Sequence, residues 1–115
     1  MRIEAFDALY VTGALAIYAN MSQIAELAQQ YRLPTIAEHP EFARNGCLLS
    51  YGDDLPRNVV RGAEYVDKIL RGAKPSDLPI EQPARFDLII NLKTARVLGL
   101  EIPSPLFARA DEIIE

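Results

Sequence analysis

The segment spanning residues 55–71 constrains the fold of this chain more than any other, because its pattern fits a long amphipathic helix. Apolar residues recur there at helical spacing and form one stripe, made up of Leu55, Val59, Ala63, Val66 and Leu70 and widened by Val60 and Ile69. Charged residues line the opposite face. Gly72 ends the helix, and the prolines that follow keep the chain from continuing it. The stripe therefore needs a second apolar surface to pack against.

Burial of this stripe represents a large part of the stability of a small domain. Fully burying its apolar side chains contributes on the order of 10 kcal/mol, at roughly 1.5–3 kcal/mol for each large one. Domains are stable by only about 5–15 kcal/mol in total. The helix must fold back on the chain's own sheet, dock onto a second copy or bind another protein. We predict a homodimer with exchanged or mutually packed helices, because exchange reuses a complementary surface.

Strand-like and helix-like segments alternate along the rest of the chain. Strands are expected at residues 6–11, 34–37, 47–50, 86–91 and 111–115, and shorter helices at residues 21–31, 40–45, 92–98 and after residue 104. The helix at residues 21–31 has an alternative start near Leu15. The apolar run at residues 6–11 predicts a strand buried on both faces. Such alternation is typical of an α/β fold with a mostly parallel sheet flanked by helices, here one domain over residues 1–115.

Charge and composition argue against several classes of partner. The formal net charge is −4, which disfavours both the phosphate backbone of a nucleic acid and an anionic membrane surface. The longest weakly polar run, residues 8–19, is too short to span a bilayer. Glu4 and Asp7 lie where a signal peptide needs its apolar segment, so we expect a cytoplasmic location for the sequence as written.

Few side chains could serve in catalysis or in metal binding. For each of them there are two interpretations, and we favour the second, structural one. His39, the single histidine, is either a metal ligand or a helix-entry residue exposed to water. Cys47, the single cysteine, is either a nucleophile or part of the core. Asp53 and Asp54 either hold a cation or a ligand amine, or they cap the following helix. We therefore expect no metal site.

The sequence contains neither G-x-G-x-x-G nor G-x-x-x-x-G-K-[ST], the motifs of nucleotide binding. No acid–base pair or nucleophile–base pair stands out. We therefore expect neither an enzyme nor a cofactor. The loop TGALAIY, residues 12–18, follows the carboxyl end of the first strand, where α/β sheets bind ligands. It is either a binding loop that uses Thr12 and Tyr18 or a small-residue loop that packs the next helix.

Residues 48–115 resemble a known family. The sequences LLSYGDD, YVDKILRGAKPSDLPIEQPARFDLIINLKTARVLGLEIP and LFARADEIIE are similar to the C-terminal part of ABC transporter substrate-binding proteins. The likeness is to the lipoprotein-like branch related to importers of tryptophan and other small solutes. Residues 1–47 follow the family's order more loosely, beginning with FDALYV, so the resemblance covers the whole chain.

This resemblance implies the last third of a two-lobed protein with the type I periplasmic-binding fold, in which two α/β lobes close on a solute. Residues 1–50 and 80–115 would belong to the second lobe. Residues 51–79, which include the long helix, would cross over to cover the first lobe, whose sequence is absent here. A permease is implied as a partner only for a full-length form. The family itself is periplasmic or lipid-anchored.

The resemblance also implies a site for a small, amino-acid-like solute, with Thr12, Tyr18, Tyr51, Gly52 and Asp54 as its candidate residues. Thr12 is a partial match to the family's polar loop after the first strand, and the YG-D segment matches near the hinge between lobes. The implied function is weak small-solute binding by a truncated substrate-binding-protein-like domain. The alternative is a non-enzymatic orphan or protein-interaction domain that has lost solute binding.

Overall fold

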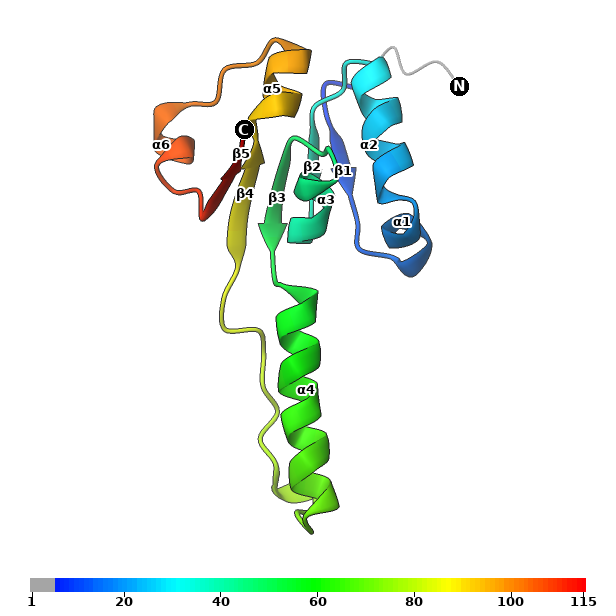
Figure 1. The fold of residues 1–115 in the computed structure, drawn as a ribbon, viewed down its shortest axis with the longest axis vertical. Helices are drawn as coiled ribbons and strands as arrows, with labels where there is room; N and C mark the ends of the chain where they lie inside the picture. The colour runs from blue at the N-terminus through cyan, green and yellow to red at the C-terminus, as the bar shows by residue number, and fades with distance from the viewer. Residues whose placement is uncertain (1–5) are drawn as a thin grey trace.

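A computed structural model describes residues 6–115 of the chain. Five strands form one sheet in the order β1-β2-β3-β4-β5, with the bounds Leu9–Val11, Thr35–Ala37, Leu49–Gly52, Asp87–Asn91 and Glu112–Ile114. β1, β2 and β3 run parallel, β3 and β4 run antiparallel, and β4 and β5 run parallel. The predicted α/β fold with a mostly parallel sheet is confirmed (Figure 1).

The helices also follow the predicted order. Their bounds are Leu15–Ala19 (α1), Met21–Gln30 (α2), Pro40–Arg44 (α3), Leu55–Leu70 (α4), Leu92–Leu98 (α5) and Ser104–Phe107 (α6), with a 3₁₀ turn at Pro75–Asp77. The alternative start near Leu15 corresponds to a separate short helix, α1. Within residues 6–115, no helix combines the length and the apolar character that a membrane crossing needs.

One face of the sheet carries the core. Side chains alternate between the two faces along a strand, and the register places Val11, Ala37 and Ser50 level with one another on the same face. All three are buried. Phe42 of α3 and Cys47 pack on this side and are fully buried. The core therefore lies between the sheet and the helices α2 and α3.

The other face of the sheet is open at β1, β2 and β3. Tyr10, Ile36 and Tyr51 lie on this face and are 59%, 36% and 59% exposed. The prediction of a strand at residues 6–11 buried on both faces is therefore wrong, because β1 is a three-residue edge strand and Phe6 precedes it exposed. An apolar run indicates a surface that is more stable when buried, but it does not show that another segment of the same chain buries it.

The long helix α4 leaves the sheet at the end of β3 and projects away from it, and residues 71–86 return along its side to β4 (Figure 1). We call residues 53–86 the arm. It lies along the longest dimension of a molecule that measures 56 × 35 × 21 Å. Asp54 caps α4, because its side chain accepts a hydrogen bond from the backbone N–H of Arg57 at 2.8 Å. No residue of α4 is buried.

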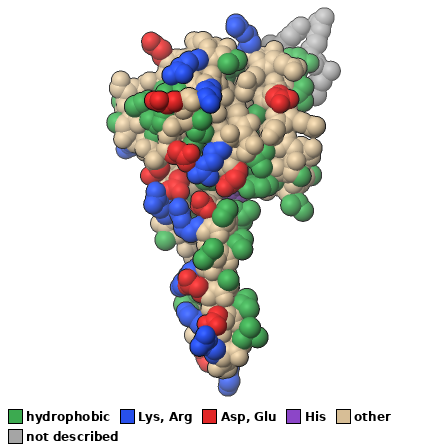
Figure 2. All heavy atoms as spheres, in the orientation of Figure 1, with side chains coloured by type: hydrophobic (Ala, Val, Ile, Leu, Met, Phe, Trp, Pro, Cys, Tyr) green, Lys and Arg blue, Asp and Glu red, His purple; other side chains and the backbone are tan. Residues whose placement is uncertain are grey.

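One side of α4 contacts the return segment, and another side is exposed. The return segment lies along one side, where Arg61 pairs with Glu81 at 2.6 Å and the Tyr65 hydroxyl donates to the carbonyl of Pro79 at 2.7 Å. The apolar stripe lies on another side and stays exposed. Figure 2 shows hydrophobic side chains along one flank of the arm and charged ones along the other. No segment among residues 6–115 buries the stripe.

The Arg61–Glu81 pair makes the attachment of the return segment sensitive to acid. Hydrogen bonding to Arg61 is the main cause that lowers the pKa of Glu81 from 4.5 to about 2. Because the attached state favours the ionised carboxylate, this support is present above pH 4.5 and is lost as the pH falls toward 2. In Arg61→Ala we expect the Glu81 pKa to return toward its usual value. Carbon-detected NMR titration of Glu81 measures this, and an unchanged pKa in the variant would show that Arg61 is not the cause.

Candidate functional site

The carboxyl ends of β1, β2 and β3 meet at one edge of the sheet, because these three strands run parallel. Thr12 follows β1, Glu38 follows β2 and Asp53 follows β3. The arm leaves the sheet at this same edge (Figure 1). We call the loops at residues 12–14, 38–39 and 53–54 the candidate edge. In α/β sheets, ligands bind outside the carboxyl ends of parallel strands.

Glu38 is held at the centre of the candidate edge by two donors. The Tyr10 hydroxyl donates to Glu38 Oε1 at 3.0 Å, and the backbone N–H of Gly13 donates to Oε2 at 2.7 Å. The hydrogen bond to Glu38 raises the pKa of Tyr10. An ionised carboxylate only accepts hydrogen bonds, and each of its oxygens has room for more than one. Glu38 therefore presents a fixed acceptor group between the ends of β1 and β2.

Two glycines make room for the turn at Glu38 and His39. A Cβ atom at Gly13 would lie 2.6 Å from His39 Nε2 and 2.8 Å from Glu38 Oε2. A Cβ atom at Gly52 would lie only 1.5 Å from the carbonyl oxygen of Glu38. Position 52 therefore requires glycine, because the atom a side chain would meet there is backbone, whereas a side chain at Gly13 would displace the His39 and Glu38 side chains. Gly52, which the resemblance places in the solute site, lets the end of β3 approach the turn after β2.

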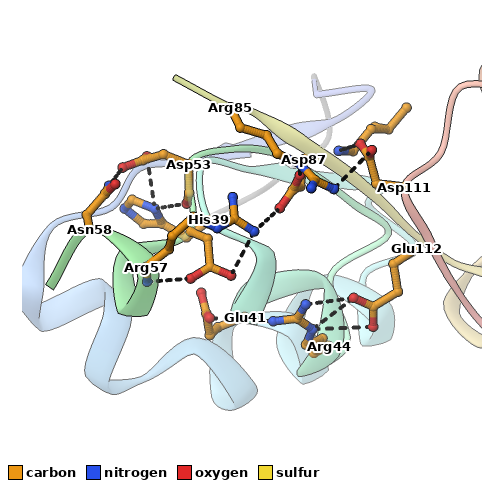
Figure 3. A network of polar contacts seen from close by, with 12 residues as sticks. His39, Glu41, Arg44, Asp53, Arg57, Asn58, Arg85, Asp87, Asp111 and Glu112 are labelled. Atoms are coloured by element: carbon orange, nitrogen blue, oxygen red, sulfur yellow. Dashed lines mark hydrogen bonds and ion pairs between the residues drawn. The ribbon is translucent and has the colours of Figure 1, made fainter. Parts of the chain in front are cut away.

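His39 connects the turn after β2 with the start of the arm. Its Nδ1 lies 3.3 Å from the carbonyl oxygen of Asp53 and 3.6 Å from Asp53 Oδ1. Asn58 donates to the other carboxylate oxygen of Asp53 (Figure 3). His39 precedes α3, as expected of a helix-entry residue, but its side chain is only 15% exposed rather than open to water. Across residues 6–115, no three His, Cys, Asp or Glu side chains gather in a way that could hold a metal.

An ion-pair network joins the two crossings between the sheet and the arm. Arg57, in the first turn of α4, lies with Nη2 3.3 Å from Asp87 Oδ2. Arg85 donates from Nε to the other oxygen of Asp87 at 2.5 Å and lies 3.6 Å from Asp111. Asp87 begins β4, so its carboxylate links the outgoing helix to the returning chain (Figure 3). The network ties the first turn of α4 to the start of β4.

The candidate residues from the sequence lie in different surroundings. Thr12 is exposed at the candidate edge. Tyr18, on α1, packs edge-on against His39 and Phe42 with ring centroids 6.0 and 5.5 Å apart, and burial is the main cause that raises its pKa. Tyr51 points instead from the open face of the sheet, where its ring lies 6.0 Å from that of Phe86. The structure thus brings Thr12 and Tyr18 to the edge region and places Tyr51 on the open face, which also carries Tyr10.

The remaining candidates have structural roles. Asp54 caps α4, as the favoured interpretation of its carboxylate predicted. Cys47 is fully buried, and this burial raises the pKa of its thiol, which fits a core residue rather than a nucleophile. Sequence reasoning missed Glu38, although its position directly after a predicted strand was a signal that could have found it. It also missed Asp87, because its partner Arg57 is 30 residues away in the chain.

An α/β domain whose parallel strands end in a polar edge has the architecture of a ligand-binding domain. Comparison with known proteins gives the family. Residues 2–114 match the family of ABC transporter substrate binding proteins. The chain belongs to this family, as its resemblance in the sequence predicted.

Three relatives illustrate the likeness. A tyrosine-binding protein of Clostridioides difficile is 25% identical over 95 residues, which are 83% of this chain and 28% of that protein. The crystal structure of an ABC domain in complex with L-Trp from Streptococcus pneumoniae has 25% identity and a TM-score of 0.86, and the match covers 96% of this chain and 37% of that one.

The third relative is a substrate binding protein with adhesive properties from Clostridium difficile, in its ligand-free, open structure. It also has 25% identity, over 97% of this chain and 37% of that one, but its TM-score is 0.65. The chain thus aligns better with the L-Trp complex than with this open structure. It spans about a third of the length of these relatives.

Proposed function

We propose that this domain takes part in capturing a small amino-acid-like solute at the candidate edge, as the solute-binding component of an ABC importer. One observation carries the proposal: the Glu38 carboxylate is held by Tyr10 and Gly13 where β1 and β2 end. The relatives support it, since one is a tyrosine-binding protein and another was solved with L-Trp.

The charges at the candidate edge favour a solute that carries an ammonium group. Glu38, Asp53 and Asp54 all lie in its loops. Arg57, in the first turn of α4, is engaged by Asp87 and Asp54. An ammonium group could therefore donate charge-assisted hydrogen bonds to Glu38, which are stronger than neutral ones. Thr12 is exposed beside it and offers a hydroxyl to the polar end of the same solute.

The arm supports a two-lobed arrangement of the kind that the family resemblance implies. We propose that residues 1–50 and 80–115 form one lobe and that residues 51–79 cross toward another. The outward direction of α4 and the greater length of the relatives support this division. Contact with a permease, and a location outside the cytoplasmic membrane, are proposed for a form that has both lobes.

Removal of the Glu38 charge tests the solute site. We expect Glu38→Gln to weaken binding of L-tryptophan or L-tyrosine by about 10- to 100-fold, because a hydrogen bond to a charged group contributes roughly 1.5–3 kcal/mol. Isothermal titration calorimetry measures the dissociation constants. Glu101→Gln, an exposed glutamate between α5 and α6, is the matched control and should bind like the native chain.

A thermal-shift screen against amino acids separates this function from the alternative. A solute present at about 100 times its dissociation constant should stabilise the chain by about 2.7 kcal/mol. If the native chain shows no stabilisation by any amino acid, the proposed solute binding is wrong. The second candidate, a non-enzymatic protein-interaction domain, would then be favoured by the exposed stripe of α4 and the open face of the sheet.

A further inference from the structure

His39, the single histidine of the chain, lies between two carboxylates. Its Nδ1 is 3.3 Å from the carbonyl oxygen of Asp53 and 3.6 Å from Asp53 Oδ1 (Figure 3). Its other ring nitrogen, Nε2, approaches Glu38. Nε2 and Glu38 Oε2 lie 2.6 and 2.8 Å from one point, the place that a Cβ atom on Gly13 would occupy. The ring therefore connects the acceptor of the proposed solute site with the start of the arm.

The hydrogen bond to Asp53 decides which ring nitrogen carries the proton of the neutral histidine. A carbonyl oxygen only accepts hydrogen bonds, so Nδ1 is the nitrogen that donates to it. The neutral ring then has its unprotonated nitrogen, Nε2, on the side of Gly13 and Glu38. A second proton, taken up from water, binds Nε2 and makes the ring positively charged. The new charge therefore appears beside the Glu38 carboxylate.

We propose that this proton competes with the ammonium group of the solute for the Glu38 carboxylate, so that solute binding weakens as the pH falls. The inference rests on the proposed solute site and gives it a means of regulation. Opposite charges within roughly 4–6 Å of each other shift a protonation equilibrium by about one pH unit or more. The distances to their shared point put Nε2 and Oε2 within this range. Because coupling between two bound groups is reciprocal, a solute on Glu38 must in turn expel the proton from Nε2.

Groups that can carry charge near the ring come from several elements: Glu38 beside it, Tyr18 of α1, Glu41 of α3, and Asp53, Asp54 and Arg57 at the start of the arm. Tyr18 packs edge-on against the ring and stays neutral near pH 7, because burial raises the pKa of its hydroxyl. Histidine is the residue type among these that ordinarily changes its charge between about pH 5 and pH 8. A comparison of the native chain with His39→Gln therefore separates the effect of the ring from that of the carboxylates.

Isothermal titration calorimetry with L-tryptophan at about pH 8 and about pH 5 spans the range in which histidine titrates. We expect the dissociation constant of the native chain to rise about tenfold at the lower pH. His39→Gln should bind with one dissociation constant at both pH values. At about pH 6.5 the native chain should release protons on binding, so its heat should depend on the ionisation enthalpy of the buffer. A native dissociation constant that does not change with pH overturns the proposal, and so does an equal change in His39→Gln.

NMR titration of the His39 ring tests its contact with Glu38 without any solute. Since the chain has one histidine, the ring signals identify themselves. In Glu38→Gln the midpoint of the titration should move about one pH unit lower, because the charged ring loses its carboxylate partner. Glu101→Gln is the matched control and should titrate like the native chain. An unchanged midpoint in Glu38→Gln overturns the proposal even where the solute binds. If the midpoint moves but no amino acid binds, the solute site is wrong, and the competition with it, although His39 and Glu38 interact.

Discussion

Gly52→Ala is expected to destabilise the chain by about 3 kcal/mol, the upper range for a substitution that overfills a packed site. The added Cβ atom would lie 1.5 Å from the carbonyl oxygen of Glu38, and the backbone there cannot move aside as a flexible side chain could. The end of β3 must then separate from the turn after β2, which carries Glu38 and His39. For a domain of this size the melting temperature should fall by roughly 10–20 °C.

Ser50→Ala is the matched control for this prediction. Ser50 lies on the same strand and the same face, and its buried hydroxyl oxygen has no hydrogen-bond partner in the structure. Its removal should leave stability unchanged or slightly raised, because an unsatisfied buried polar group carries a cost. Thermal unfolding followed by circular dichroism compares the two. If Gly52→Ala melts like the native chain, then β3 and the turn after β2 do not approach each other as described.

Phe42→Ala is expected to lower the free energy of unfolding by about 3–5 kcal/mol, as truncation of a fully buried aromatic residue usually does. Phe42 joins α3 to the core and supports the ring of Tyr18 edge-on. Loss of the ring should therefore loosen α1 and the loop that carries Thr12, and solute affinity should fall together with stability. Chemical denaturation measures the first effect and calorimetric titration the second.

Phe107→Ala provides the control for Phe42. Phe107 lies on α6 and is 43% exposed, so its truncation removes less buried area and should cost about 1 kcal/mol or less. Equal losses for the two variants would mean that the core does not lie between the sheet and α3. A loss of stability without any change in solute affinity would show that the core does not position the candidate edge.

The order of elements could be predicted because each signal for it is local. The stripe of α4, the proline that begins α3 and the glycine that follows α5 all lie within one element or beside it. The order of strands in the sheet is not local, so the antiparallel pairing of β3 with β4 was not foreseen. The prediction that β1 is buried on both faces was wrong for the same reason. The segments that bury a strand lie far away in the chain or belong to another molecule.

The place of the candidate edge and the position of Thr12 in it could be predicted from the sequence, whereas the role of Glu38 could not. The loop after the first strand lies at the edge where parallel strands end, as expected, and Thr12 lies in it. Glu38 was missed because its two donors, Tyr10 and Gly13, are 28 and 25 residues away. The family resemblance makes Gly52 a candidate for the solute site, and it gives residue identities without distances. In the folded chain, the carbonyl oxygen of Glu38 occupies the space where a Cβ atom at Gly52 would lie.

A solute site at the carboxyl edge of β1, β2 and β3 is tested most directly by NMR. The amide signals of the ¹⁵N-labelled chain would be followed during titration with L-tryptophan and with L-tyrosine. We expect saturable shifts at Thr12, Gly13 and Glu38, and none in α5. Saturable shifts centred on the apolar groove between β1 and α2, which Leu9 and Ile24 line, would contradict this placement, and so would a complete absence of shifts with both amino acids.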